Sequence, residues 1–161
     1  CSGLKIIELA SVLAGPSVGA FFAEFGASVI KVENPQTKGD VTRSWRTAGE
    51  QGDSDISAYF ASVNFGKRSL ALDISQQQGR DVLYSLLSDS DVIIASYKPG
   101  DAEKLGVAYA EVKKHNPNII YGHIIGFFSQ FLMLLKCCQW VFHIATNNWK
   151  TIFHWFVSIL D

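Results

Sequence analysis

Short apolar segments rich in β-branched residues alternate with helical segments over the first 126 of the 161 residues. The predicted strands cover residues 4–9, 28–33, 69–73, 91–95 and 118–125. The predicted helices cover residues 17–25, 56–63, 76–87 and 102–115, the last one interrupted near Gly106. In the third helix, Val82, Leu83, Leu86 and Leu87 share the predicted apolar face. Strict alternation is typical of an α/β fold, so we predict an incomplete Rossmann-like parallel sheet with helices on both faces.

Ligands of such sheets bind beyond the carboxyl ends of the strands. The candidate loops are therefore residues 10–15, 33–43, 73–75 and 96–100. The second of these belongs to a long polar stretch, residues 34–55, and a connection of that length is usually functional or mobile.

Glycine and proline divide the chain into two parts. All 13 Gly and all four Pro precede residue 127, whereas residues 127–161 carry nine of the 20 aromatic residues and only three charges. We therefore predict two regions, a folded part at 1–126 and an unrelated tail at 127–161 that is helical or disordered. The tail's longest charge-free stretch has 13 residues, whereas a membrane-spanning helix needs about 20, so no membrane association is expected.

Charge and cysteine content narrow the function classes. A net charge of −1 argues against a nucleic-acid-binding protein, which would carry a basic excess. Three cysteines, two of them adjacent, do not form a disulfide framework, so a reducing compartment is expected. The chain begins with Cys1 rather than Met, so we expect a trimmed or partial N-terminus, with any targeting segment upstream.

Several local patterns have more than one interpretation. Gly15 is the only glycine of the first strand-to-helix turn, so the dinucleotide pattern G-x-G-x-x-G is absent, although Glu33 lies where an NAD-binding acid would be expected. The interpretation of this region as half of an NAD dehydrogenase is therefore less favoured than a plain tight turn between strand and helix. Lys67 and Arg68 could bind phosphate or carboxylate, but a solvated loop is favoured on this feature alone. The same alternatives apply to Arg43 and Arg46.

Metal and nucleophile patterns are also absent. No G-x-S-x-G occurs, and His115 and His123 fall in a predicted helix end and a predicted strand, where structural roles are favoured. A possible cluster in the tail has spacing that matches no zinc pattern, so no metal site is predicted; it comprises Cys137, Cys138, His143 and His154.

Taken together, several stretches resemble the N-terminal part of the family III CoA-transferases, the group that includes formyl-CoA transferase and carnitine CoA-transferase. They are residues 13–16 (LAGP), 26–33 (GASVIKVE), Gly39-Asp40 with Arg43, 64–73 (NFGKRSLALD), 98–100 (KPG), 105–106 (LG) and 116–127 (NPNIIYGHIIGF). Each stretch is weak alone, but their order and spacing across about 126 residues indicate the family.

The resemblance implies a transferase that moves CoA from an acyl-CoA of the succinyl-CoA type to a free dicarboxylic acid. It implies a CoA thioester as substrate, no bound cofactor or metal, an interlocked homodimer and, from an animal member of the family, a mitochondrial location. The implied CoA contacts are Val12, Leu13, Ala14, Leu72, Asp73, Ser75, Ser96, Tyr97, Lys98 and Lys104. Lys104 stands where the family often has Arg, and Asn34 stands where some members have a basic residue.

The family's nucleophile is an Asp that attacks the thioester to form a mixed anhydride. It follows a glycine-rich segment that this chain matches only as far as Phe127, and Asp161 has no matching context. No catalytic residue is therefore assigned, and we expect this truncated chain to be inactive alone. The alternative is a non-catalytic module that binds CoA or a nucleotide, or a dimerisation partner of a full-length subunit.

Overall fold

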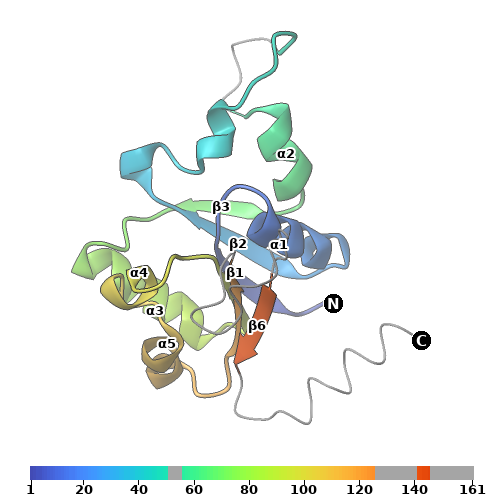
Figure 1. The fold of residues 1–161 in the computed structure, drawn as a ribbon. Helices are drawn as coiled ribbons and strands as arrows, with labels where there is room; N and C mark the ends of the chain where they lie inside the picture. The colour runs from blue at the N-terminus through green and yellow to red at the C-terminus, as the bar shows by residue number, and fades with distance from the viewer. Residues whose placement is uncertain (51–55, 126–140, 146–161) are drawn as a thin grey trace, which may run out of the picture.

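The structure is a computed structural model that describes residues 1–50 and 56–125, together with the backbone of residues 141–145. Within this part of the chain, one sheet has the strand order β3-β2-β1-β4-β5-β6 (Figure 1). The strands are β1 (Lys5–Leu9), β2 (Ser28–Glu33), β3 (Arg68–Ala71), β4 (Val92–Ala95), β5 (Ile120–Ile125) and β6 (Val141–Ala145). Strands β1 to β5 are parallel, and β6 pairs antiparallel with β5.

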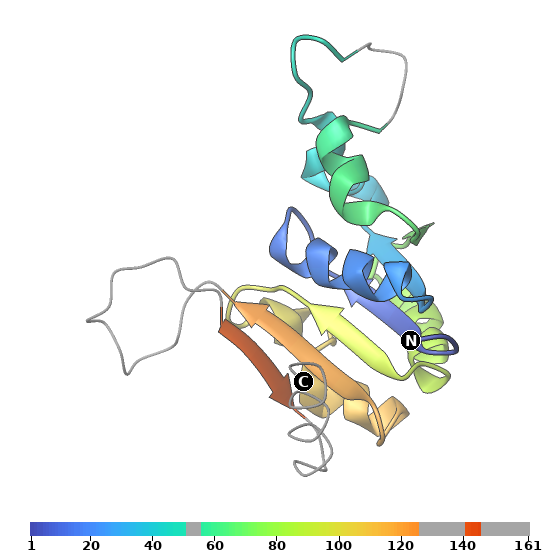
Figure 2. The same ribbon diagram turned by 90° about the vertical axis from the view of Figure 1, so that its right-hand side faces the viewer.

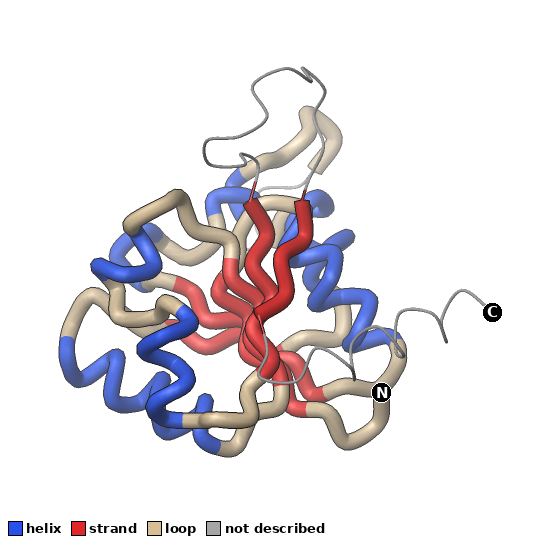
Figure 3. The backbone as a smooth tube through the Cα atoms, turned by 60° about the horizontal axis from the view of Figure 1, so that its bottom comes forward, coloured by secondary structure: helices blue, strands red, loops and turns tan. Residues whose placement is uncertain are grey.

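Helices cover both faces of the sheet. They are α1 (Ala14–Glu24), α2 (Ala58–Asn64), α3 (Gln77–Ser88), α4 (Asp101–Lys104) and α5 (Tyr109–His115), with short 3₁₀ helices η1 (Pro35–Thr37) and η2 (Val41–Ser44). Figure 1 shows α1 and α2 on one side of the sheet and α3, α4 and α5 on the other, and Figure 3 shows helices flanking the strands on both sides. This arrangement confirms the predicted α/β fold with a parallel sheet and two helical layers.

Strand β1 lies at the centre of the sheet and alternates between two cores. Ile6 faces the core under α1, where it packs near Val29 and Ile94. Ile7 and Leu9 face the core formed with α3 and α5. Because β1 is buried on both sides, an almost continuous apolar run is the pattern expected for it.

The strand order creates a switch point between β1 and β4. The chain runs from β1 outward to β2 and β3, then returns to β4 on the other side of β1. The view in Figure 2 shows the loops that leave these two strands diverging to opposite faces of the sheet. Ligands of open α/β sheets bind at such a point, beyond the carboxyl ends of the strands.

Residues 34–50 contain more structure than the predicted polar loop. The Asn34 side chain accepts a hydrogen bond from the Gln36 amide at the start of η1, and the Asp40 side chain accepts one from the Thr42 amide at the start of η2. These are the residue types that cap helix starts most often. Capping therefore orders the loop that follows β2.

Several predicted boundaries shift in the structure. Strand β3 ends at Ala71 rather than at residue 73, β5 begins at Ile120, and α1 begins at Ala14, before Pro16. Val82 was predicted on the buried face of α3 but is 48% exposed, whereas Leu83 and Leu87 are 0% exposed. Val82 lies about 100° around the helix from Leu83, so it falls at the edge of the apolar stripe.

Residues 141–145 form a strand within the segment for which a helix or disorder was predicted. Strand β6 covers the outer edge of β5, which would otherwise carry unpaired backbone groups. The rest of that segment, with the possible metal cluster at Cys137, Cys138, His143 and His154, lies outside the described residues or side chains. In the described part of the chain, no helix has the length and apolar character needed to cross a membrane.

Candidate functional site

A cavity of about 1130 Å³ opens beyond the carboxyl ends of the parallel strands. Leu9 and Ala10 at the end of β1 contribute to its lining, as do Glu33 at the end of β2, Ala71 at the end of β3 and Ser96 directly after β4. The cavity therefore includes the switch point between β1 and β4. The loop after β2 supplies much of the remaining lining, as predicted for residues 33–43.

The charge around this cavity is predominantly positive. Among the described residues that line it, two are acidic, Glu33 and Asp40, and four are cationic: Lys31, Lys38, Arg43 and Arg46. A lining with an excess of cations favours a ligand that carries several negative charges.

Glu33 is held by three neighbours. Its carboxylate accepts hydrogen bonds from Arg43 Nε at 2.8 Å and Nη2 at 2.6 Å, and from Ser69 Oγ and the Asp40 amide. Burial acts to raise the pKa of Glu33, but the hydrogen bonds from Arg43, Asp40 and Ser69 outweigh it and lower the pKa to about 2. Glu33 therefore fixes the loop after β2, and its contacts with Arg43 argue against the ribose-binding role considered from the sequence.

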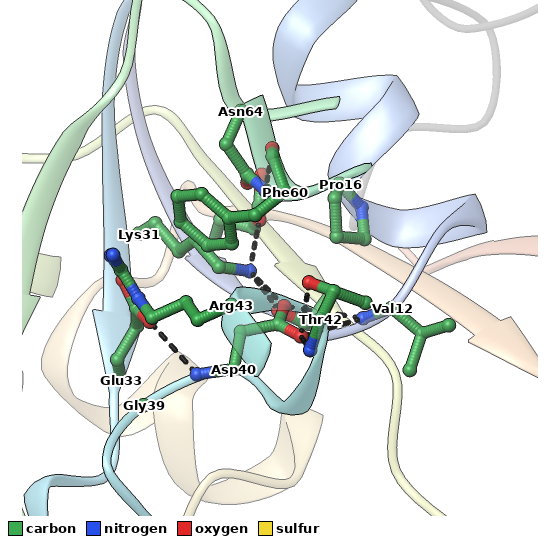
Figure 4. Close-up of polar contacts among 12 residues, drawn as sticks. Val12, Pro16, Lys31, Glu33, Gly39, Asp40, Thr42, Arg43, Phe60 and Asn64 are labelled. Atoms are coloured by element: carbon green, nitrogen blue, oxygen red, sulfur yellow. Dashed lines mark hydrogen bonds and ion pairs between the residues drawn. The ribbon is translucent and has the colours of Figure 1, made fainter. Parts of the chain in front are cut away.

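Phe60 and Gly39 pack closely against the Glu33–Arg43 pair. Figure 4 shows Arg43 reaching back from η2 to Glu33, with its guanidinium 3.9 Å from the centroid of the Phe60 ring on α2. Gly39 has a φ of +83°, and a Cβ atom there would lie 2.5 Å from Glu33 Oε2. The glycine is thus needed both for the backbone conformation and for the approach of the carboxylate.

Asp40 and Lys31 form a buried ion pair beside the cavity. Lys31 Nζ lies 3.0 Å from Asp40 Oδ2 and 3.0 Å from Glu8 Oε1. Burial acts to raise the pKa of Asp40, but hydrogen bonds from Thr42 and the charge of Lys31 lower it below its usual value. Asp40 is therefore an anion held among fixed donors.

Lys67 completes a group of buried charges under α1. Its Nζ lies 2.7 Å from Glu8 Oε2 and donates to the Pro16 carbonyl and to Asn64 Oδ1. Burial lowers the pKa of Lys67, while the charge of Glu8 opposes that shift. The favoured expectation of a solvated loop is therefore wrong for Lys67, whereas Arg68 is exposed and donates to Ser28 Oγ.

Sequence reasoning missed this buried group, although one signal was present. Glu8 interrupts the apolar sequence of β1, and Lys31 interrupts that of β2. The two residues are directly opposite each other in the parallel register of these strands. Two opposite charges in matching positions of neighbouring buried strands predict an ion pair once the register is known.

The predicted CoA contacts fall into three short segments, each at or just after residues that line the cavity, and one more distant position. Ser96 and Tyr97 line the cavity, and Lys98 follows them directly. Val12, Leu13 and Ala14 follow the lining residues at the end of β1, and Leu72, Asp73 and Ser75 follow Ala71. Lys104 lies at the end of α4, exposed, with Nζ 3.5 Å from Asp101 Oδ1.

Within these segments, local hydrogen bonds fix several of the predicted residues. Asp73 Oδ1 accepts hydrogen bonds from the Ser75 amide and from Ser75 Oγ. The Ser96 amide donates to the Leu9 carbonyl, which ties the loop after β4 to β1. Burial raises the pKa of Tyr97, so its phenol stays neutral and can act as a hydrogen-bond donor.

Lys38 and Arg46 also line the cavity. Lys38 was not singled out from the sequence, and for Arg46 a solvated loop was favoured over phosphate or carboxylate binding. Their position on the cavity wall depends on the two short helices η1 and η2, which have no strong periodic pattern. Across the described residues, no group of three or more His, Cys, Asp or Glu side chains is arranged to hold a metal ion.

Comparisons with known proteins identify one family. The family model for CoA-transferase family III matches residues 1–130. The chain is 43% identical over 131 residues to an acyl-CoA transferase from Fusarium pseudograminearum, covering 78% of this chain and 28% of the relative. It is 39% identical over 125 residues to the succinyl-CoA:glutarate CoA-transferase of Mus musculus, covering 78% of this chain and 28% of that protein.

Solved structures agree with the sequence comparison. A CAIB/BAIF family protein from Brucella suis matches with a TM-score of 0.69 and 42% sequence identity, over 78% of this chain and 33% of that protein. The chain thus spans about a third of the length of the relatives that it matches.

Proposed function

This chain belongs to CoA-transferase family III, and from that premise we propose that residues 1–126 form the part of such a transferase that binds the CoA thioester. Residues 127–161 are then a separate region outside this binding unit. The described residues that line the cavity, from Leu9 to Tyr97, all fall within the first region.

One observation carries the proposal: a cavity with excess positive charge lies at the switch point of a parallel sheet. CoA carries a diphosphate and a ribose phosphate, so it is a polyanion that such a cavity would attract. Strand-end loops at this position commonly bind nucleotides. Lys38 and Arg46 are the proposed phosphate contacts on the wall formed by the loop after β2.

Of the ten contacts implied by the family resemblance, Ser96 and Tyr97 lie in the cavity lining itself. We propose that residues 12–14, 72–75 and 96–98 contact CoA, because they continue the strand ends that line the cavity. Lys104 would reach the ligand from α4 as a point charge rather than as a two-donor fork.

For the whole protein we propose transfer of CoA from a succinyl-type acyl-CoA to a free dicarboxylic acid. Relatives named succinyl-CoA:mesaconate and succinyl-CoA:glutarate CoA-transferase support this substrate class. A homodimer and a mitochondrial location stay predictions from the family resemblance. A carboxylate nucleophile would attack the thioester carbonyl, giving an acyl anhydride and releasing the CoA thiolate.

Calorimetric titration of the 161-residue chain with CoA tests the binding site. The double variant Lys38→Met/Arg46→Met is expected to bind CoA at least about tenfold more weakly, because each side chain would supply a charge-assisted contact to phosphate. The matched control Lys113→Met/Lys114→Met removes two cations from α5 and is expected to leave the affinity within about twofold. Equal losses in both double variants, or no binding of CoA, would contradict the proposed site.

A second assay tests the expectation that these 161 residues bind CoA without transferring it. The purified chain is incubated with succinyl-CoA and glutarate, and new acyl-CoA is separated by chromatography. We expect no glutaryl-CoA above the level without protein, because no acid in this sequence matches the family's nucleophile. Product that depends on the chain would refute that expectation while supporting the family activity.

A further inference from the structure

We propose that Asp40, held by Lys31, is a positioning residue that fixes the turn after β1 in the conformation that the CoA site requires. The inference rests on the proposed function, since it assigns a role to a group beside the proposed CoA contacts. It concerns the backbone of the turn, not a direct contact of Asp40 with the ligand.

Val12 adopts an unusual backbone conformation in this turn. Its φ is +71°, in the left-handed region that a β-branched residue rarely occupies. Such a conformation persists only where the surroundings hold it, and it is often associated with binding sites. The Val12 amide points to Asp40 and donates to its two carboxylate oxygens at 3.2 and 3.4 Å (Figure 4).

Asp40 can hold this amide because its own carboxylate is fixed. It is 5% exposed, and it accepts hydrogen bonds from the Thr42 amide at 3.0 Å and from Thr42 Oγ at 2.8 Å. Lys31 Nζ lies 3.0 Å from its other oxygen. The carboxylate is therefore surrounded by donors from β2, from η2 and from the turn itself.

Lys31 contacts the same turn from the other end. Its Nζ donates to the Ala10 carbonyl at 2.6 Å, two residues before Val12. The Lys31–Asp40 pair thus binds the backbone on both sides of Ser11, which lines the cavity. We call this arrangement the turn clamp, comprising Lys31, Asp40 and the backbone of Ala10 and Val12.

The turn clamp joins two walls of the proposed CoA site. One wall is the end of β1 as far as Ser11, which the predicted contacts Val12, Leu13 and Ala14 follow directly. The other wall is the loop after β2 that carries Lys38. If the clamp opens, the two walls lose their fixed separation, even though no group that touches CoA has been removed.

The first test needs no ligand. Hydrogen exchange of the Val12 amide is followed by NMR in the wild-type chain and in the double variant Lys31→Met/Asp40→Ala. This variant removes one positive and one negative charge together. Glu8 keeps Lys67 as its partner, so no buried charge is left isolated. We expect Val12 to exchange at least about tenfold faster in the variant, relative to amides in β1.

A control at the opposite end of the sheet separates the clamp from general stability. Asn116 donates to the carbonyls of Leu87 and Ser90, far from the cavity, so Asn116→Ala is expected to lower stability without selective exposure of Val12. Unchanged Val12 exchange in the double variant, or an equal selective change in Asn116→Ala, would overturn the clamp.

The second test links the turn conformation to ligand affinity. Proline at position 12 lacks the amide hydrogen and holds φ near −65°, whereas glycine keeps the amide and accepts a positive φ. We expect Val12→Pro to weaken CoA binding at least about tenfold more than Val12→Gly. Both variants are checked for folding by circular dichroism, and if Val12→Pro does not fold, Lys31→Met/Asp40→Ala takes its place in the titration.

The outcomes separate this inference from the proposed function. CoA binding by the wild type with equal affinities for folded Val12→Pro and Val12→Gly overturns the positioning role and leaves CoA binding intact. Absence of CoA binding by the wild type overturns the proposed site and the role at it, while the exchange experiment still shows whether the turn clamp exists.

Discussion

At the scale of single residues, the buried charges under α1 are balanced by opposite neighbours. Glu8 contacts Lys31 and Lys67, and Lys31 also contacts Asp40, so two acids and two cations are buried together. A buried ion pair adds little net stability, but removing one partner leaves an isolated charge at high cost. The group is therefore a strong constraint on which substitutions the fold tolerates.

This balance predicts the effect of removing Lys67. We expect Lys67→Met to lower the free energy of unfolding by about 3–5 kcal/mol, because it leaves Glu8 with one cation shared with Asp40. Glu8→Gln/Lys67→Met removes both charges and is expected to recover part of that loss. Urea unfolding of the two variants and of Glu8→Gln measures the coupling, and strictly additive losses would argue against the pairing.

Glu33 is expected to make the free energy of unfolding fall as the pH is lowered. Its pKa is lowered to about 2 in the folded chain from 4.5, so its contribution to stability is complete above pH 5 and declines as the pH falls toward 2. We expect roughly 3 kcal/mol from this group at neutral pH, and a weaker loss of stability between pH 5 and pH 3 in Glu33→Gln. Urea unfolding at pH 7, 5 and 3 checks this, with the exposed Glu24→Gln as the control that keeps the wild-type profile.

At the scale of elements, small residues let α1 pack closely against β1. Its buried face contains Gly15, Pro16, Gly19 and Ala20. A Cβ at Gly15 would lie 2.3 Å from Ala10 Cβ, and one at Gly19 would lie 1.9 Å from Glu8 Oε2. These small residues let the helix approach the end of β1 and cover the buried charges.

The close approach predicts that Gly19→Ala destabilises the chain. Alanine is favoured over glycine in a helix by about 1 kcal/mol, but here the added methyl would collide with a fixed carboxylate. We expect a net loss of about 2 kcal/mol in thermal or urea unfolding, as for other overpacked sites. Ser17→Ala, on the exposed side of α1, provides the matched control, and a Gly19→Ala chain as stable as that control would refute the packing.

Elements with strong local patterns were predictable from the sequence. β2 runs from Ser28 to Glu33, the range predicted from its short run rich in β-branched residues, and α3 begins and ends within one residue of the predicted range. The helices η1 and η2 were not predictable, because three or four residues carry no periodic signal. Their positions depend on caps and on the contact between Glu33 and Arg43.

At the scale of the whole molecule, three of the four predicted strand-end loops, 10–15, 33–43 and 96–100, contribute to the cavity lining, whereas residues 73–75 do not. The turn clamp was not predicted. Asp40 lies 28 positions from Val12, and its carboxylate reaches that amide only after β1 and β2 have paired. The general position of a ligand site follows from the order of strands and helices. The particular groups that shape it follow from contacts distant in sequence.

The proposed division at residue 126 makes a prediction for the whole molecule. Because the described cavity lining falls between Leu9 and Tyr97, a chain of residues 1–126 is expected to keep the CoA affinity of the 161-residue chain within about threefold. Its stability is expected to be lower, since the edge of β5 loses its pairing with β6. Calorimetry and thermal unfolding of the two chains test this, and loss of affinity in a folded shorter chain would contradict the division.

Binding of CoA at the carboxyl edge of the sheet underlies all of these proposals. The most direct measurement is NMR mapping of amide chemical shifts in the nitrogen-15-labelled chain during titration with CoA. We expect the largest changes at residues 10–14, 34–46, 72–75 and 96–98, at the carboxyl edge of the sheet. Changes concentrated at the opposite edge, near Lys5 and Asn116, or no changes at saturating CoA, would contradict it.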